Sequence, residues 1–500
     1  MKKIFAIMMT ICLLASLLCV SAFAAEPADE LPEPAEGTVL RVTATKGNDT
    51  VLIGDYTNFE DGWNDAMELA GSTRQMRNNG YDRVVVDIYT NWTAAADGNF
   101  TDDGWLEKNG PGFDNDTIFV PADAKVTLNL NGYTINRGLT DDINDGEVMF
   151  INDDADIIIN DGTITGGFSN SEGAGLYIEG AKVTLNNVHI TGNTVEDDDG
   201  AGIAAYGGAT LIINGGSISD NIVSKDSVED FYGGAIYIEN GTATLTGVTI
   251  QGNAYDDPNM CWLYGAVIYS VNSSIKMSNC TVQENGLAEY NGVAYGDVNS
   301  IIYAEDSEVV LENTDFIDNG HKSVKSFGSG RYRSNPIANS FFSVKDSDFT
   351  LTGGTFTGND MAFLIKLVDS TAYVEGVDFT DNDALALVTA NDSSTPSVFI
   401  DCKFGAGTSI SDYYKYDFDF WDDESGVTFE DCTFNKSTFS DKSAATFIGG
   451  NVSNSVGSIF GEGSFTMIVS LAALAVSAAC LGTTMSLKKK LEPAKPADEE

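Results

Sequence analysis

A short phrase repeats seven times along this chain and constrains its fold more than any other feature. In each copy an apolar residue is followed three residues later by an asparagine. The copies are NVHITGN at 187–193, GGSISDN at 215–221, GVTIQGN at 247–253, NCTVQEN at 279–285, NTDFIDN at 313–319, GGTFTGN at 353–359 and GVDFTDN at 376–382. Repetition of this kind predicts a solenoid, in which each repeat buries its apolar face on the next.

The residues just before each phrase predict a strand. We name the apolar residue of each phrase, with its equivalents in four weaker copies, the anchor. The anchors are Ile135, Ile164, Ile190, Ile218, Ile250, Val282, Phe316, Phe356, Phe379, Phe404 and Phe434. The positions five and seven residues before an anchor are apolar with one exception, Ser397; in the first repeat they are Leu130 and Leu128. This period of two is typical of a β-strand.

A second strand lies further upstream in each repeat. The position fourteen residues before eight consecutive anchors is apolar, although the anchors themselves are 23 to 40 residues apart. Its residues are Phe150, Leu176, Ala204, Ile236, Ile268, Ile302, Phe342 and Ile365. The turn between the two strands is therefore predicted to have a fixed length, and one corner of each repeat varies.

Strands that recur at this spacing can pair in parallel with the same strand of the next repeat, and parallel crossovers are right-handed. The predicted fold class is all-β, a right-handed parallel β-helix over residues 116–452. Equivalent positions then stack, so the seven asparagines should form a ladder at one bend. Asparagine suits a bend because it tolerates the left-handed backbone region and its amide can bond the next amide.

The N-terminal part predicts export and a cap. Residues 1–24 have the basic start, apolar run and small-residue cleavage site of a secretory signal peptide, and a flexible leader follows at 25–37. Residues 38–115 are predicted to cap the open end of the solenoid with strands at Val39–Thr45 and Arg83–Tyr89 and a helix at Asp61–Arg77. The apolar face of that helix carries Trp63, Ala66, Met67 and Ala70.

The C-terminal part predicts a membrane anchor. After a linker at 453–464, residues 465–487 form an uncharged run of 23 residues, long enough to span a bilayer as one helix. The tail at 488–500 begins with three lysines, which favours a cytoplasmic location. We expect a single-pass protein at the cell surface, with its N-terminus outside and its C-terminus in the cytoplasm.

The repeats resemble those of a known group of surface proteins. GGAI at 233–236, with FIDN at 316–319, FTGN at 356–359 and FTDN at 379–382, is similar to the GGAI and FxxN repeats of polymorphic outer-membrane adhesins. VTLNLNGYTI at 126–135 resembles the first coil of pectin-lyase-like β-helices on bacterial surfaces. The resemblance covers about residues 60–450 and implies surface display and adhesion to host cells or polymers. Many repeats differ from the adhesins in having Ile or Val where those have Phe.

The charge of the chain limits its partners. The formal net charge is −47, which disfavours general binding to nucleic acid and repels other acidic surfaces. Aspartates in turns could bind Ca²⁺, but the sequence has no Asp-x-Asp-x-Asp-Gly loop. We therefore predict no cofactor, with Ca²⁺ as the alternative, and a monomer whose partner is a carbohydrate or another cell-surface ligand.

Three cysteines follow the repeat. Cys280, Cys402 and Cys432 each lie two residues before an anchor, and the simplest interpretation is that this position holds a small core residue. Cys402 and Cys432 belong to consecutive repeats and should stack. A disulfide between them is allowed by this placement but not required.

The sequence carries no recognisable catalytic constellation. Galacturonase-like hydrolases carry NTD, DD, HG and RIK motifs, of which only an isolated DD at Asp153–Asp154 is present. His189 lies one residue before its anchor and should face solvent, and His321 lies in a variable loop. The alternating Tyr416, Phe418 and Phe420 are better explained as a strand of the next repeat than as a sugar site.

The variable corner is the predicted binding edge, because loops on one face of a repeat array stack along that face. Its aromatic residues could serve as platforms for sugar rings or could pack on the flank of the solenoid. Its basic loop could attract carboxylates or sulfates or could pair with nearby aspartates. The candidate ligand-binding residues are Tyr255, Trp262, Tyr264, Lys322, Lys325, Arg331, Tyr332 and Arg333.

These observations favour a non-enzymatic, membrane-anchored surface protein with an adhesin-like role, which binds a glycan or a host or neighbouring cell surface through that edge. The alternative is a surface-tethered polysaccharide lyase or hydrolase of the pectin-lyase-like fold. A structural spacer with no specific ligand is a third and simpler reading.

Overall fold

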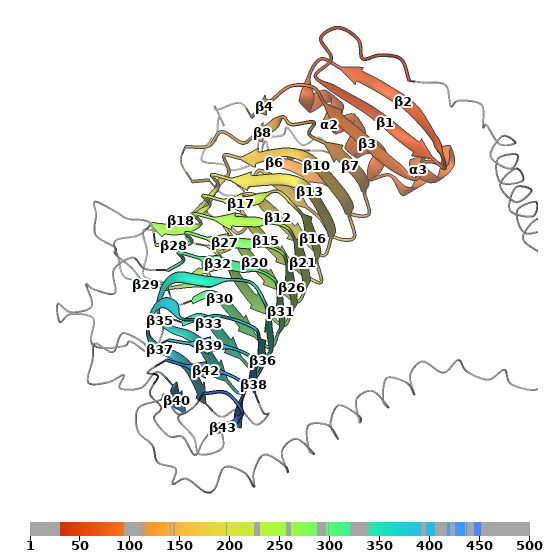
Figure 1. Ribbon diagram of the computed structural model, residues 1–500. Helices are drawn as coiled ribbons and strands as arrows, with labels where there is room; N and C mark the ends of the chain where they lie inside the picture. The colour runs from red at the N-terminus through yellow and green to blue at the C-terminus, as the bar shows by residue number, and fades with distance from the viewer. Residues whose placement is uncertain are drawn as a thin grey trace, which may run out of the picture. The chain divides into compact units, whose positions relative to one another are not determined.

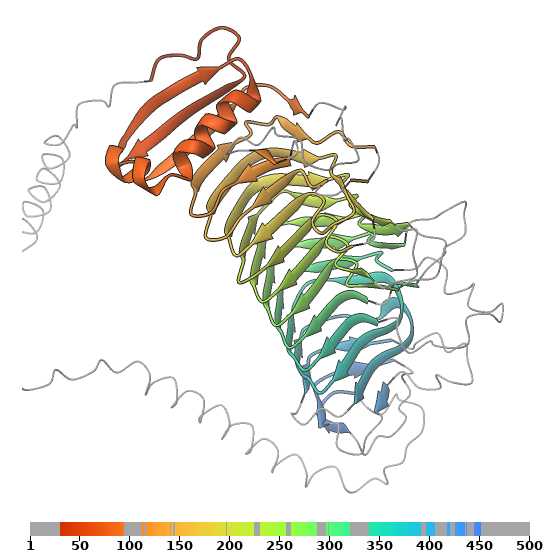
Figure 2. The ribbon, with the colours of Figure 1, turned by 180° about the vertical axis from the view of Figure 1, so that it is seen from behind.

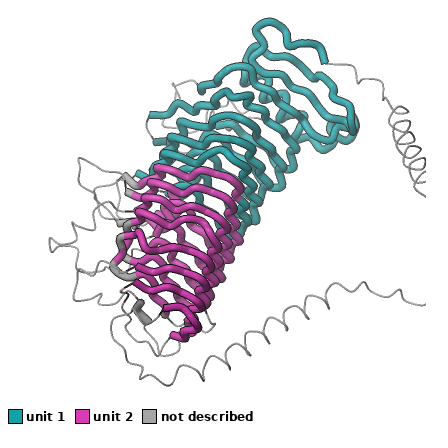
Figure 3. Tube along the Cα trace, viewed as in Figure 1, with its two compact units in different colours: residues 1–226, 235–244 teal, residues 227–234, 245–500 magenta. Residues whose placement is uncertain are grey.

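The computed structural model describes residues 31–94, 113–114, 117–140, 142–143, 146–196, 198–224, 231–256, 262–287, 297–298, 300–320, 340–391, 397–405, 418–420, 426–435, 437 and 445–451. The chain divides into two compact units (Figure 3). Unit 1 comprises residues 1–226 and 235–244, and unit 2 comprises residues 227–234 and 245–500. Strand β21 (Thr242–Thr246) contains the division between them in the sequence.

Unit 1 begins with an antiparallel sheet and two helices. β1 (Leu40–Lys46) pairs with β2 (Asp49–Tyr56) on one side and with β3 (Arg83–Ile88) on the other. The strands predicted near 39–45 and 83–89 are thus confirmed. The single helix predicted over 61–77 is wrong in its continuity, because the structure has α2 (Phe59–Ala70) and α3 (Thr73–Asn79).

Local capping explains the break between the helices. The Gly71 amide closes α2 on the carbonyl of Met67, and Ser72 begins α3 by accepting a hydrogen bond from the Gln75 amide at 3.2 Å. Gly80 ends α3 with a φ of 69°, in the left-handed region that glycine adopts without strain. The predicted helical face is correct, since its four residues are all buried.

Helix α2 lies along one face of the three-stranded sheet (Figure 2). Trp63 is fully buried and donates a hydrogen bond from Nε1 to the carbonyl of Phe119 at 3.3 Å. Phe59 stacks on Trp92, with ring centroids 4.8 Å apart. The helix is therefore held to the first parallel coil by both packing and a buried hydrogen bond, and its predicted capping role stays a prediction.

The rest of unit 1 consists of parallel strands stacked in three columns (Figure 1). The first column contains β6 (Thr117–Val120), which β5 (Phe113–Asp114) joins antiparallel, then β9 (Met149–Ile151), β12 (Leu176–Glu179), β15 (Ile203–Tyr206) and β20 (Ile236–Glu239). The second contains β3, β7 (Lys125–Asn129), the starts of β10 (Asp156–Thr165) and β13 (Lys182–Thr191), and β16 (Thr210–Asn214). The third contains β4 (Trp92–Thr93), β8 (Thr134–Asn136), the ends of β10 and β13, and β17 (Ser217–Ser219). A short sheet of β11 (Phe168–Ser169), β14 (Thr194–Glu196) and β18 (Ile222–Ser224) follows the third column.

Unit 2 has the same three columns. The first contains β25 (Ile268–Val271), β30 (Ser300–Glu305), β33 (Ser340–Lys345), the end of β35 (Phe356–Val368), β37 (Asp381–Asn391) and β40 (Phe418–Phe420). The second contains β26 (Ser274–Ser278), β31 (Glu308–Glu312), β34 (Asp348–Thr352), β36 (Thr371–Glu375), β38 (Val398–Ile400), β41 (Val427–Glu430) and β43 (Ala445–Ile448). The third contains β22 (Thr249–Gln251), β27 (Thr281–Gln283), β32 (Asp315–Ile317) and the start of β35, and β39 (Lys403–Phe404) pairs with β42 (Thr433–Phe434). Three short pairings complete it: β23 (Ala254–Asp256) pairs with β28 (Gly286–Leu287), and β24 (Trp262–Tyr264) pairs with both β19 (Phe231–Tyr232) and β29 (Asp297–Val298).

The anchors stack in register at the centre of the third column, as predicted. Ile135, Ile164, Ile190 and Ile218 are direct neighbours in unit 1, and Ile250, Val282, Phe316 and Phe356 are direct neighbours in unit 2. All eleven anchors are buried. The later ones form a row of rings, with Phe356 and Phe379 5.2 Å apart and Phe379 and Phe404 5.4 Å apart. β40 confirms the strand predicted around Phe418, which pairs with the buried Val388.

Two predicted registers are wrong, and both errors come from turns that are longer than assumed. In the first repeat, Leu128 rather than Leu130 is the neighbour of Ile159, because the turn at Asn131–Gly132 is two residues longer. In the first column, Leu176 stacks on Met149 and Ile203 rather than on Phe150 and Ala204. The coils that contain Met149 and Ile203 have one more residue between their first and second strands than the coil that contains Leu176.

The predicted asparagine ladder is confirmed within each unit. Nδ2 of Asn193 donates to Oδ1 of Asn221 at 2.9 Å in unit 1. In unit 2 the same bond runs through Asn253, Asn285, Asn319, Asn359 and Asn382 at 2.9–3.0 Å. The bonding of each amide to the next is thus confirmed, but the predicted left-handed conformation of the asparagine is wrong, because the left-handed residue of six bends is the one before it. These residues are Gly192, Asp220, Gly252, Glu284, Asp318 and Gly358.

The three cysteines of the repeats are buried and free. The predicted small-core role is confirmed, and the disulfide that the placement allowed between Cys402 and Cys432 is not formed. The Cys402 thiol lies 3.3 Å from the carbonyl of Ile400, so it is hydrogen-bonded to its own strand. The pKa of the Cys432 thiol is raised by its hydrogen bond with Cys402 and, to a smaller extent, by burial.

Several predicted segments lie outside the described residues. These are the signal peptide at 1–24, the start of the leader at 25–37, the linker at 453–464, the membrane helix at 465–487 and the tail at 488–500. In the described part of the chain, neither helix has the length and apolar character needed to cross a bilayer. Parallel pairing already begins at β3, which lies inside the range predicted as a cap.

Candidate binding surface

The first column of strands presents aromatic side chains on its outer face. Along each strand the inward positions are apolar and buried, as at Ile268, so the next residue points outward. Tyrosine occupies this outward position thirteen residues before four anchors. These tyrosines are Tyr177, Tyr237, Tyr269 and Tyr303. Because equivalent positions stack in register, their rings are brought close to one another along the column.

In unit 2 two of them form the centre of a larger aromatic group. Tyr269 and Tyr303 are direct strand neighbours, and their rings stack with centroids 4.9 Å apart and planes 9° apart. Tyr232 on β19 lies 4.7 Å from Tyr269, and Tyr264 on β24 lies 5.6 Å from Tyr303. Tyr232 and Tyr264 are themselves 5.4 Å apart. We name these four half-buried residues the tyrosine patch.

Charged neighbours hold one edge of the tyrosine patch. The Tyr303 hydroxyl donates to Glu305 at 2.8 Å, and Lys345 on the next coil forms an ion pair with the same carboxylate. Burial alone would raise the pKa of Glu305, but the hydrogen bonds from Lys345 and Tyr303 outweigh it and lower that pKa. Burial, followed by the bond to Glu305, raises the pKa of Tyr303. Tyr303 is therefore a neutral hydroxyl beside a charged pair at neutral pH.

The same tyrosine–glutamate arrangement recurs elsewhere in the chain. Tyr237 donates to Glu239 at 3.1 Å in unit 1, and Tyr373 donates to Glu375 at 2.6 Å in unit 2. In both pairs the residues are two apart on one strand, so they project from the same side. The pairing is thus a local consequence of strand geometry, whereas the clustering of four rings is particular to the tyrosine patch.

Unit 1 has its own aromatic column. Phe119, Phe150 and Tyr177 follow one another with centroid distances of 5.4 and 5.0 Å. Tyr206 then lies between Tyr177 and Tyr237, at 5.7 and 5.0 Å. Burial, followed by the nearby Glu172, raises the pKa of Tyr177 to about 12. The first three rings pack in T-shaped pairs, Tyr206 is tilted against both of its neighbours, and Tyr237 is only 8% exposed.

The predicted binding residues are only partly described. Tyr264 belongs to the tyrosine patch, where it both packs on the flank and stays half-exposed. The backbones of Tyr255 and Trp262 lie on β23 and β24, but their side chains fall outside the described residues. The basic loop also falls outside them, so its role stays a prediction. Its predicted members are Lys322, Lys325, Arg331, Tyr332 and Arg333.

The sequence prediction missed Tyr269 and Tyr303, because it looked for ligand contacts only in the variable loops. Both residues occupy the outward position thirteen residues before an anchor, which is a signal that was available in the sequence. The structure shows that loop aromatics and strand aromatics meet on one flank. Tyr232 on β19 makes that contact directly.

The described residues that were considered for catalysis lie in a turn or on an exposed face. His189 is exposed, and its Nδ1 lies 2.9 Å from the hydroxyl of Ser217 on the next coil. Asp153 and Asp154 form the turn between β9 and β10, where Asp154 has a φ of 58°. His321 lies outside the described residues. In the parts of the chain that the structure covers, no three His, Cys, Asp or Glu side chains are grouped so that they could hold a metal ion.

The comparison with protein families agrees with this geometry. Residues 142–342 match the family model described as a right handed beta helix region. This segment is similar to right-handed β-helices. Its parallel coils are consistent with the pectin-lyase-like fold that the sequence resembles. Comparisons with curated proteins and with solved structures gave no match.

Proposed function

We propose that the protein is a non-enzymatic, adhesin-like β-helix of the cell surface, which binds a glycan on a host or neighbouring cell through the tyrosine patch and the loops beside it. The observation that carries this proposal is the meeting of four half-buried tyrosine rings from two different sheets on one flank.

Tyrosine side chains suit such a surface for a physical reason. They offer a large, rigid and amphipathic contact area at a low cost in conformational entropy, so they dominate many recognition surfaces. The rings of Tyr269 and Tyr303 are stacked and nearly parallel, and each also contacts one other tyrosine ring. A preorganised apolar platform with hydroxyl groups at its rim matches a sugar ring, which has C–H faces and a polar edge.

The polar groups beside the rings add hydrogen-bonding capacity. Glu305 accepts from Tyr303 and Lys345, and a carboxylate has lone pairs for further donors such as sugar hydroxyls. Lys345 supplies a donor next to it. Two strands contribute these polar groups: Tyr303 and Glu305 lie on β30, and Lys345 lies on β33. A few placed polar groups beside an apolar surface can fix the orientation of a ligand.

Display outside the cell is part of the proposal. It rests on the predicted signal peptide at 1–24 and the predicted membrane helix at 465–487. The net charge of −47 supports a soluble, mutually repelling external region. With that charge the protein should favour neutral glycans, except at the predicted basic loop around Lys325 and Arg331, where acidic glycans would be drawn.

A glycan array probed with the purified full chain tests the proposal. We expect binding that weakens at least about tenfold in Tyr303→Ala and in Tyr264→Ala, as for central residues of a recognition surface. Tyr373→Ala is the matched control, since it removes a tyrosine that pairs with a glutamate on β36, away from the tyrosine patch. Lys325→Glu and Arg331→Glu test the basic loop separately.

Two outcomes would overturn this function. Silence across the array would favour a structural spacer. New reducing ends or unsaturated products after incubation with acidic polysaccharides, lost on mutation of one aspartate, would identify a lyase or hydrolase instead.

A further inference from the structure

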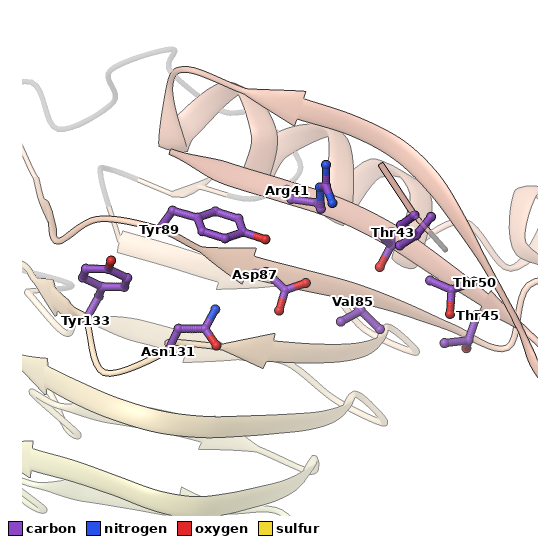
Figure 4. A pocket seen from close by; sticks show the side chains of 10 residues that line it. Arg41, Thr43, Thr45, Thr50, Val85, Asp87, Tyr89, Asn131 and Tyr133 are labelled. Atoms are coloured by element: carbon purple, nitrogen blue, oxygen red, sulfur yellow. The ribbon is translucent and has the colours of Figure 1, made fainter. Parts of the chain in front are cut away.

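A pocket lies in unit 1, on the outer face of the N-terminal sheet. Its volume is about 530 Å³, within the range of roughly 300–1,000 Å³ that is usual for small-molecule sites. It is lined by Leu31, Arg41, Thr43, Thr45, Thr50, Val85, Asp87, Tyr89, Asn131 and Tyr133 (Figure 4). Tyr89 and Tyr133 lie at one end and Thr45 and Thr50 at the other, with Asp87 and Asn131 between them (Figure 4).

Strand alternation explains why these side chains share one face. On β3 the inward residues Val84, Val86 and Ile88 are fully buried, so Val85 and Asp87 point to the opposite face. Asp87 lies directly across from Arg41 on β1 and directly beside Asn129 on β7. β3 is thus the floor of the pocket, with an antiparallel neighbour on one side and a parallel neighbour on the other.

The irregular turn of the first repeat builds the pocket wall. This is the turn that made the predicted register wrong, because it carries two more residues than its equivalents. Asn131 within it has a φ of 54° and donates from Nδ2 to the carbonyl of Ile88 at 3.1 Å, which fixes the turn against β3. Tyr133 follows, and its amide closes the turn on the carbonyl of Leu130. A turn of the length found in the later repeats would place neither Asn131 nor Tyr133 at the pocket.

Internal pairing neutralises the cation of the pocket. Arg41 binds Asp55 through two hydrogen bonds of 2.6 and 2.9 Å and donates a third to the carbonyl of Pro32 at 2.8 Å. The hydrogen bond to Asp55 raises the pKa of Arg41 and lowers that of Asp55, so both remain charged and paired. The guanidinium is therefore committed within the protein, and the pocket has no spare positive charge among the described residues to attract an anion.

The remaining polar groups are suited to a hydroxylated ligand. Asp87 accepts from Nδ2 of Asn129 at 2.8 Å, which orients the carboxylate and leaves lone pairs for other donors. Within the described residues, no hydrogen bond uses the hydroxyl groups of Thr50, Tyr89 or Tyr133. Burial, followed by the charge of Asp87, raises the pKa of Tyr89, so its phenol stays a neutral donor.

We infer that this pocket binds a neutral saccharide of one or two rings, with Tyr89 and Tyr133 against its C–H surface and Asp87 and Asn131 on its hydroxyl groups. A carboxylate and an amide side by side offer acceptors and a donor to neighbouring hydroxyls, and the two phenols supply apolar area. The site is separate from the tyrosine patch, and the inference does not depend on the proposed function.

Titration of the full chain with a panel of neutral disaccharides (lactose, maltose, cellobiose and chitobiose) tests the inference by calorimetry. We expect at least one to bind and its affinity to fall at least about tenfold in Tyr133→Ala and in Asp87→Asn, as for the loss of a hydrogen bond to a charged group. Asn131→Gly should act likewise, because glycine keeps the left-handed backbone while the amide is removed.

Two controls separate binding from folding. Thermal unfolding of each variant shows whether the sheet is intact, and Tyr303→Ala leaves the pocket whole while it removes part of the tyrosine patch. Loss of binding in the three pocket variants but not in Tyr303→Ala supports the inference. Absence of binding by every disaccharide, binding of inorganic phosphate or glucuronate in their place, or affinity that is equal in all variants would overturn it.

Discussion

The asparagine ladder allows a quantitative test of what holds the coils together. Asn285 is 1% exposed, and its Nδ2 lies 2.9 Å from the carbonyls of Ile250 and Gln283 and 3.0 Å from Oδ1 of Asn319. Its Oδ1 accepts from the backbone and side-chain nitrogens of Asn253. Asn285→Asp keeps the shape and the acceptor but replaces the donor with an oxygen that faces three other oxygens.

The expected cost follows from that inventory. Two N–H donors are lost, and each buried acceptor left without a partner costs about 1–3 kcal/mol, so the loss should be at least about 3 kcal/mol at pH 7. Asn382→Asp is the matched control at the end of the ladder. Asn382 is half-exposed and donates only to the carbonyl of Phe356, at 2.7 Å, so its loss should be about 1 kcal/mol.

The penalty should also depend on pH. Burial among acceptors raises the pKa of the introduced carboxyl in the folded state above its ordinary value near ~3.9. The folded state then holds a proton that the unfolded state releases, so stability relative to the parent falls as pH rises through this range and recovers near pH 4. Urea denaturation at both pH values and hydrogen exchange of peptides around Asn285 measure the effect. Equal losses at the two asparagines, or a loss at Asn285 that persists at pH 4, would refute the reasoning.

Three further predictions concern the core, the outer tyrosines and the thiols. Phe356→Ala should cost about 3–5 kcal/mol in chemical denaturation and Phe356→Leu much less, because the ring contacts Phe316, Phe341 and Phe379 and leaves a cavity when removed; equal costs would contradict this. Tyr177 stabilises the fold below the ordinary tyrosine pKa near ~10 and loses that contribution as pH rises through its raised pKa of about 12, so Tyr177→Phe should unfold less readily at alkaline pH in a circular dichroism titration. Cys280, Cys402 and Cys432 should resist alkylation in the folded protein and react only on unfolding, as read by peptide mass spectrometry; rapid labelling of folded protein would show that these coils open.

The repeated part of the fold could be predicted because each repeat states the same pattern again. The anchors and the ladder residues follow from spacing alone, and their burial follows from stacking. Prediction failed where a turn departed from the common length. The two added residues near Asn131 moved Leu128 into the place assigned to Leu130, since a period-two pattern cannot distinguish a slip of two residues.

The candidate sites were harder to predict for a related reason. A site depends on which outward residues of distant segments meet, and apolar periodicity reports only the inward ones. Tyr303 is outward, and its partner Tyr264 comes from a strand outside the three columns. The pocket of unit 1 needs the irregular turn, the leader at Leu31 and an antiparallel strand together. None of these three features is part of the repeated pattern, so the pattern could not predict them.

The acidity of the chain has a backbone cause as well as a solution role. Every described non-glycine residue with a positive φ is Asp, Asn or Glu. Bends need residues that tolerate the left-handed region, and Asp and Asn are the common choices besides glycine. Because the bends of successive coils stack, aspartates that occupy these left-handed positions lie above one another, and their carboxylates repel.

Asp401 and Asp431 provide a case where the two effects can be separated. They follow the paired residues Ile400 and Glu430 and have φ values of 51° each, so they occupy the same bend of adjacent coils. Asp401→Asn keeps the left-handed tolerance and removes one charge of an exposed like pair, so it should stabilise by up to about 1 kcal/mol at low salt and by less at high salt. Asp401→Ala removes the same charge and also the short polar side chain whose local hydrogen bonding favours the left-handed region, at a cost of about 1–2 kcal/mol, so it should destabilise. Thermal unfolding of both variants at two ionic strengths decides the matter, since a stabilising alanine would mean that charge rather than backbone geometry governs these bends.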